Sequence, residues 1–158
     1  MKLAGTCLLA CLAIVAAGCG GSDDEPSTPA ACLEGSDAYA EALADAPDEV
    51  LVGGETPISD CLPDGQSAGE QSDVGEAMVA AATELNDEAR KAPQGEVPVQ
   101  LGYLVGAVQA AAESSSGIHE DLALRVESAA TFIPSDDLLP AGFQQRYEEG
   151  IAAGMASG

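Results

Sequence analysis

Side chains that could carry out chemistry gather at few places in this sequence, and the only histidine marks one of them. In the segment SSSGIHED, His119 follows three serines and precedes Glu120 and Asp121. A histidine beside hydroxyl and carboxyl groups could serve a catalytic triad or bind a metal ion. However, one histidine with no spare cysteine makes a poor zinc site, and the H-E-x-x-H pattern is absent. We therefore expect His119 in the first turn of an exposed helix, and we predict no catalytic residue, cofactor or metal site.

Acidic side chains form the second group, with pairs at Asp136–Asp137 and Glu148–Glu149. Carboxylate oxygens are ligands for Ca²⁺, and an EF-hand loop combines them at alternate positions with a central glycine and a closing glutamate. The segment 60–71 has a glycine at its sixth position, but it lacks an oxygen ligand at the third and the closing glutamate. We interpret the acidic residues as a solvated surface.

Cysteines form the third group, and one of them stands at a sharp change in composition. The run from Leu3 to Ala17 is almost wholly apolar, and Cys19 follows it directly after Gly18. The segment 20–31 is then rich in glycine, proline, serine and acids. The five cysteines are Cys7, Cys11, Cys19, Cys32 and Cys61.

The start of the chain resembles the signal peptide of bacterial lipoproteins. Lys2 precedes an apolar run shorter than the roughly 20 residues that span a bilayer, and Ala16-Ala17-Gly18-Cys19 is similar to a lipobox. The resemblance implies that residues 1–18 are removed and that the thiol of Cys19 carries a diacylglycerol. The protein would then be anchored to the cell membrane or outer membrane, on the extracytoplasmic face. An ordinary secretory signal that leaves Cys19 as a free thiol, and an uncleaved anchor helix, are the alternatives.

Once residues 1–18 have left and Cys19 carries lipid, two cysteines remain. An even pair in an exported chain indicates a disulfide, because the compartment is oxidising. We predict that Cys32 and Cys61 are bonded and close an N-terminal loop, the alternative being two buried thiols. Such a loop would stabilise the fold by roughly 3.5 kcal/mol.

Length and charge limit what the mature chain can do. Residues 19–31 have the composition of a disordered tether, and residues 32–158 are enough for a single domain. The formal net charge of the whole chain is −22. Binding to nucleic acid, or to anionic lipid by charge, is therefore excluded, since both need a basic surface. Contact with the membrane would come from acyl chains.

The hydrophobic pattern is helical along the whole domain and predicts an all-α fold, a small bundle of four to five helices. The first helix spans Ser36–Ala46, with Ser36 as its cap, and residues 48–66 follow as an irregular connection in which Val50–Val52 is at most an unpaired strand. The other helices begin near Ser67 or Ser72, with a capping box to Glu70, and then near Pro98, Ile118 and Pro140. Their expected inner faces contain Tyr39 and Leu43; Val74, Met78, Ala81 and Leu85; Leu101, Leu104 or Val105, Val108 and Ala112; Ile118, Leu122, Val126, Ala129 and Ile133; and Leu139, Phe143, Tyr147, Ile151 and Met155.

Two glycine pairs fall inside predicted helices, Gly102 with Gly106 and Gly150 with Gly154. Each glycine costs about 1 kcal/mol relative to alanine in a helix. A compensating gain is the close approach of two backbones, so we predict that these helices pack tightly against each other or against a neighbour.

These features favour a lipid-anchored helical protein that acts by contact with a protein partner in the cell envelope, as an adaptor or accessory protein. The alternative is a small module that binds a ligand or cation in a groove between helices. An enzyme that uses His119 is a third possibility, without a sequence feature that suggests its substrate.

Overall fold

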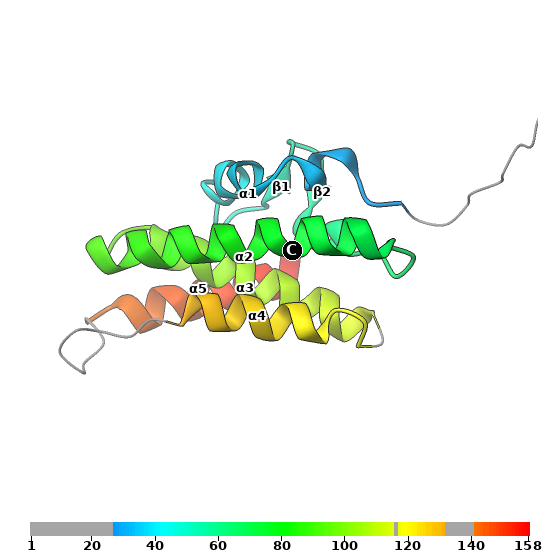
Figure 1. The fold of residues 1–158 in the computed structure, drawn as a ribbon. Helices are drawn as coiled ribbons and strands as arrows, with labels where there is room; N and C mark the ends of the chain where they lie inside the picture. Colours follow the sequence, from blue (N-terminus) through cyan, green and yellow to red (C-terminus); the bar gives the residue numbers. More distant parts are fainter. Residues whose placement is uncertain (1–26, 116, 132–140) are drawn as a thin grey trace, which may run out of the picture.

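The computed structural model describes residues 27–115, 117–131 and 141–158, and its fold is mostly helical, as predicted (Figure 1). The predicted signal peptide (residues 1–18), Cys19, Ile133, Leu139 and Pro140 lie outside the described residues. The α-helices of the described part are α1 (Ser36–Leu43), α2 (Ala68–Lys91), α3 (Val97–Ser114), α4 (Glu120–Ala130) and α5 (Phe143–Ser157). Two short 3-10 helices, η1 (Ala30–Leu33) and η2 (Ile58–Cys61), and two strands, β1 (Leu51–Val52) and β2 (Thr56–Pro57), complete it.

Helix α3 forms the centre of the domain and contacts α1, α2, α4, α5 and η2. Its predicted inner face is buried, but burial continues around the helix and includes Val99, Tyr103 and Ala107. A helix that is apolar on all sides is stable when other elements surround it. The expectation of a single buried face was therefore too narrow for α3.

Helix α2 follows the sequence pattern closely. The hydroxyl of Ser67 accepts a hydrogen bond from the backbone N–H of Glu70, and the Glu70 carboxylate accepts one from the N–H of Ser67. This capping box confirms Ser67, rather than Ser72, as the start. The predicted inner residues of α2 are all buried, and Arg90 and Lys91 lie in its last turn.

Helices α3 and α5 pack backbone against backbone through the two glycine pairs, which confirms the predicted close approach. Along the contact, residue numbers rise together in α3 and α5, so the two helices run parallel. Helix α4, which lies between them in the sequence, carries the chain back in the opposite direction. A Cβ atom added at any of the four glycines would collide with a carbonyl oxygen of the facing helix: Gly102 with Tyr147, Gly106 with Ile151, Gly150 with Val99 and Gly154 with Tyr103.

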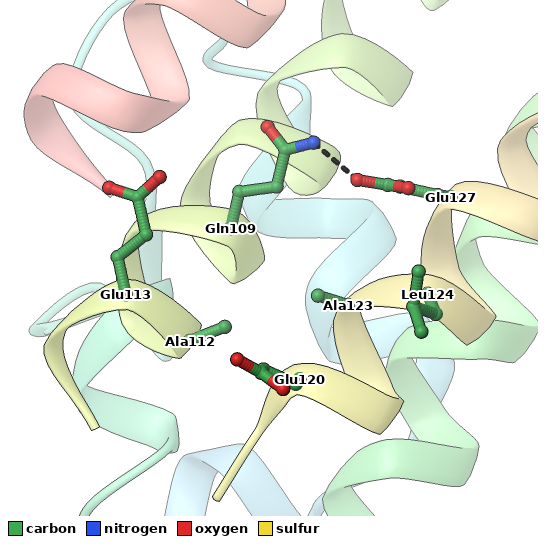
Figure 2. Close-up of a pocket in the computed structure, with 7 residues that line it drawn as sticks. All are labelled: Gln109, Ala112, Glu113, Glu120, Ala123, Leu124 and Glu127. Carbon is green, nitrogen blue, oxygen red and sulfur yellow. Dashed lines mark hydrogen bonds between the residues drawn. The ribbon is translucent and has the colours of Figure 1, made fainter. Parts of the chain in front are cut away.

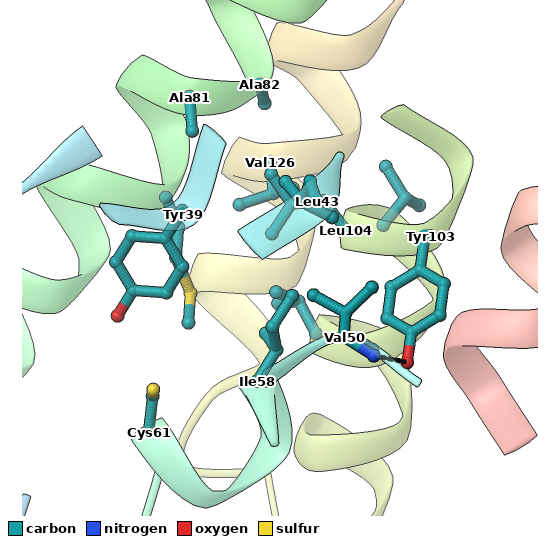
Figure 3. Packing of buried hydrophobic residues seen from close by; sticks show 14 of the residues in the cluster. Tyr39, Leu43, Val50, Ile58, Cys61, Ala81, Ala82, Tyr103, Leu104 and Val126 are labelled. Carbon is teal, nitrogen blue, oxygen red and sulfur yellow. Dashed lines mark hydrogen bonds between the residues drawn. The ribbon is translucent and has the colours of Figure 1, made fainter. Parts of the chain in front are cut away.

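The N-terminal elements form a layer that covers α2 and α3 (Figure 1). A disulfide joins Cys32 of η1 to Cys61 of η2 as predicted, and both residues are fully buried. The hydroxyl of Tyr39 donates a hydrogen bond to the carbonyl of Cys32. The backbone N–H of Val50 donates a hydrogen bond to the hydroxyl of Tyr103, which joins the layer to the central helix (Figure 3).

Strand β1 has a partner, contrary to our expectation. It pairs antiparallel with β2, with Val52 opposite Thr56. Gly53 and Gly54 both have positive φ angles, 64° and 80°, which lets the chain reverse within a short loop. The prediction of an irregular connection missed this hairpin, because the second strand is only two residues long and ends in a proline.

The helix ends and faces differ from the predictions in several places. Helix α1 has Gly35, rather than Ser36, at its N-cap position and ends at Leu43. Ile118 precedes α4 and is 50% exposed, and Met155 of α5 is 46% exposed, although both were predicted to face the core. In α5 the buried positions are Phe143 and the two glycines, since small residues mark the side that lies against α3.

The packed domain begins earlier than Cys32. Thr28 is buried, and its hydroxyl accepts a hydrogen bond from the side-chain amide of Gln66. The last part of the predicted tether, which begins at Thr28 and ends at residue 31, therefore contacts the domain. Across the described ranges, every helix is too short or too polar to cross a bilayer.

The glycine contact between α3 and α5 gives a first prediction. Replacing Gly106 by alanine forces the new methyl group onto the backbone of Ile151, which cannot rotate away, so we expect a loss of about 3 kcal/mol or more in the free energy of unfolding. Gly69 of α2 is the matched control, because an added Cβ there has no heavy atom within 4 Å. We expect Gly69→Ala to be neutral or to stabilise by up to about 1 kcal/mol. Equal effects of the two variants in urea unfolding would contradict the proposed packing.

The disulfide gives a second prediction. Its two cysteines are 29 residues apart, so removing the link should lower the free energy of unfolding by about 3.5 kcal/mol through the regained freedom of the unfolded chain. Urea unfolding of the reduced wild-type protein measures the link alone, because both sulfur atoms keep their places in the core. The double variant Cys32→Ala/Cys61→Ala should lose at least as much. A loss below about 1 kcal/mol in both would show that the link does not stabilise the fold.

Candidate functional site

A groove lies between the last turns of α3 and most of the length of α4, with a volume of about 470 Å³ (Figure 2). Its lining combines small apolar side chains with carboxylates. The residues are Gln109, Ala112 and Glu113 of α3 and Glu120, Ala123, Leu124 and Glu127 of α4. The groove can therefore offer negative charge around an apolar floor.

One stripe of α4 contributes most of this surface. Glu120, Leu124 and Glu127 occupy positions i, i+4 and i+7, which lie on the same side of a helix. Leu124 is 65% exposed, the most exposed of the large hydrophobic residues in the described part of the chain. Across the groove, the side-chain amide of Gln109 donates a hydrogen bond to the Glu127 carboxylate, which holds that carboxylate at the edge between the helices (Figure 2).

A second hollow, of about 420 Å³, lies on the other side of Glu127, between α4 and α5. Its floor contains the stacked rings of Phe143 and Tyr147, whose centroids are 5.9 Å apart, and its edge carries Glu148. Burial raises the pKa of Tyr147 to about 12, and the negative charge of Glu127 adds to the rise. Glu127 thus contributes to both hollows.

The described lining of these two hollows contains several carboxylates and no cation. Glu113, Glu120, Glu127 and Glu148 contribute carboxylates, whereas Lys and Arg are absent from the described residues that line them. Of the nearby cations, Arg146 pairs with Glu96 and donates through Nε to the carbonyl of Gly95. Arg125 of α4 lines a different hollow, together with Asp121 and residues of α2. The four carboxylates therefore give the described lining of these hollows a negative charge.

His119 is not exposed, so that prediction was wrong. The side chain is 1% exposed and lies at the N-cap position of α4, after a turn in which Gly117 has a φ angle of 88°. This turn points His119 inward and leaves Ile118 in solvent. Neither ring nitrogen has a hydrogen-bond partner among the described residues. The imidazole is thus not presented to a substrate on the surface.

One catalytic pattern escaped the sequence analysis. Residues 65–69 read Gly-Gln-Ser-Ala-Gly and match G-x-S-x-G, the pattern of a serine nucleophile on a strained turn between strand and helix. Ser67 has an extended backbone instead, with φ −66° and ψ 153°, and it follows a turn after η2 rather than a strand. Its hydroxyl accepts a hydrogen bond as the helix cap. The structure thus gives Ser67 a structural role.

The remaining candidate residues of the sequence analysis do not come together in one site among the described residues. Asp136–Asp137 and Cys19 lie outside the described residues, and Glu148 and Glu149 are exposed on α5. The segment 60–71 is divided between the end of η2, a turn and the start of α2, so it does not form an EF-hand loop. Across the described ranges, there is no group of three His, Cys, Asp or Glu side chains arranged to hold a metal ion.

Comparisons of the chain with protein-family models, with curated proteins and with solved structures give no match. The groove and the sequence around Cys19 are therefore the observations from which a function can be argued. Sequence analysis missed the groove. The signal that could have indicated it was Leu124, which lies between Glu120 and Glu127 and outside the predicted inner face of its helix.

The pKa of Tyr147 provides a prediction for the site. The pKa of Tyr147 in the folded protein is about 12, above the ordinary value of 10.0, so folding favours the neutral phenol. Its contribution to the free energy of unfolding is therefore complete below pH 10 and is lost as the pH rises toward 12. Glu127→Gln should lower this pKa, since it removes the neighbouring charge. The measurement is an ultraviolet titration of tyrosinate, with Tyr147→Phe to assign the transition. Glu84→Gln, a change on the surface of α2, is the control, and an unchanged midpoint in Glu127→Gln would contradict the proposed coupling.

Proposed function

We propose that the protein is a lipid-anchored, extracytoplasmic adaptor, which holds a helical domain close to a membrane and acts by contact with a protein partner. The observation that carries the proposal is the sequence Ala16-Ala17-Gly18-Cys19 at the end of a short apolar run that follows Lys2. The disulfide between Cys32 and Cys61 supports it weakly, because such links form in oxidising compartments.

The distance from Cys19 to the domain limits where the protein could act. Thr28 is already buried against the domain, and it lies nine positions along the chain from the proposed anchor, Cys19. A fully extended chain of this length spans about 30 Å, and a flexible one about 16 Å on average. The domain would therefore stay within about one domain diameter of the bilayer.

The chemistry of the described surface favours contact over catalysis. The hollows beside α4 combine carboxylates and two amides with apolar side chains, while the histidine is buried and Ser67 caps a helix. A cation-binding module is the alternative function, but the carboxylates of these hollows are not gathered into a metal-holding group among the described residues. We therefore favour a protein partner.

The anchor can be tested by expression of the full chain in a bacterium. Cys19→Ser should move the protein out of the detergent-soluble membrane fraction or leave residues 1–18 attached, since a serine cannot accept the diacylglycerol. Cys11→Ser is the matched control, because that residue lies inside the segment that should be removed, and it should leave membrane attachment unchanged. Mass spectrometry of the wild-type product should show a chain that begins at Cys19 with added acyl mass. A bare thiol at Cys19 would refute the anchor.

A further inference from the structure

The two hollows beside α4 adjoin at Glu127, which lines both of them. Along α4, an exposed leucine is flanked by two glutamates, and Glu113 and Glu148 add charge on either side. We propose that this surface, called here the α4 surface, docks a basic amphipathic helix of the partner protein. The inference rests on the proposed adaptor function and names the chemistry of its partner.

The spacing of the charges indicates a helical partner. Glu120 and Glu127 are seven residues apart, which corresponds to about 10 Å along α4, or two turns. A second helix laid along α4 would place Lys or Arg two turns apart against these carboxylates. Between them, three or four residues from each cation, an apolar side chain would cover Leu124. The two hollows would accommodate side chains of the partner helix that lie on either side of this line of contacts.

Charge decides between possible occupants. A second copy of the chain would bring another net charge of −22 to an acidic surface, and anionic lipid or nucleic acid would add negative charge as well. A basic helix is attracted instead, and it meets carboxylates that have no Lys or Arg beside them in the described lining. Exposed charge pairs of this kind contribute modestly, whereas the covered leucine adds apolar burial that selects for an amphipathic helix.

The position of the α4 surface fits a partner near the membrane. Ser114, the last residue of α3, lines a hollow together with Ser27, the first residue that the structure describes. Glu113 and Glu120 therefore lie at the same end of the bundle as Ser27, which is the end where Figure 1 shows α3 and α4 connected. A helix docked there would lie within reach of the bilayer surface.

The test uses the mature protein and a synthetic helical peptide of about 18 residues with lysines seven apart that flank a leucine. Binding is measured by fluorescence anisotropy at low salt. We expect Glu120→Gln/Glu127→Gln to raise the dissociation constant about tenfold and Leu124→Ala to raise it about fivefold. A peptide of the same composition, with its lysines and leucine on opposite faces, should bind at least tenfold more weakly.

Matched variants separate docking from general attraction. Glu34→Gln/Glu41→Gln removes the same charge from another acid-lined hollow, near α1, and Met155→Ala removes another exposed apolar side chain. We expect each to change the dissociation constant less than about twofold. Equal weakening by the two double variants, or equal binding of both peptides, would overturn the inference.

The result of the docking experiment can be interpreted independently of the test of lipidation at Cys19. The protein is taken from the membrane fraction, or from the soluble fraction if Cys19 proves bare. Selective binding with a bare Cys19 would support the docking surface and refute the anchor. A lipidated Cys19 without selective binding would refute the docking surface alone.

Discussion

The approach of α3 and α5 depends on four missing side chains. Gly102, Gly106, Gly150 and Gly154 leave room for the carbonyl groups of the facing helix, so two parallel backbones lie in direct contact. Parallel neighbours cannot be joined by a short turn, and α4 therefore runs back between the end of α3 and the start of α5. The groove exists because α4 returns beside α3, and the second hollow exists because α5 then follows α4. Both features of the candidate site thus follow from the glycine contact.

The accuracy of the fold prediction differs from helix to helix, according to how each helix is packed. Periodic apolar residues predicted α2 correctly, since that helix has one buried side and a capping box at its start. In α5 the same pattern suggested Met155 as a core residue, but the buried positions include glycines, which a hydrophobic pattern does not register. His119 was misplaced because its environment depends on the turn at Gly117, whose effect on burial is a property of the tertiary structure.

The candidate site was less accessible to sequence analysis than the fold. The disulfide could be predicted from the number of cysteines that remain in an exported chain, and the structure confirms the pair. The α4 surface combines side chains of three helices, so its residues come together only once the packing is known. Acidic residues are frequent along the whole chain, and their abundance concealed the four that share one face without a neighbouring Lys or Arg in the described lining.

The position of the disulfide has a mechanical consequence. A pull on the N-terminal end enters the domain at η1, crosses the sulfur–sulfur bond from Cys32 to Cys61, and continues through the short turn into α2. Residues 33–60, which include α1 and the hairpin, form a closed loop beside this load path and bear no tension. If the chain is held at a membrane while a partner moves, the force would reach the long helices directly, and the layer that covers them would stay folded.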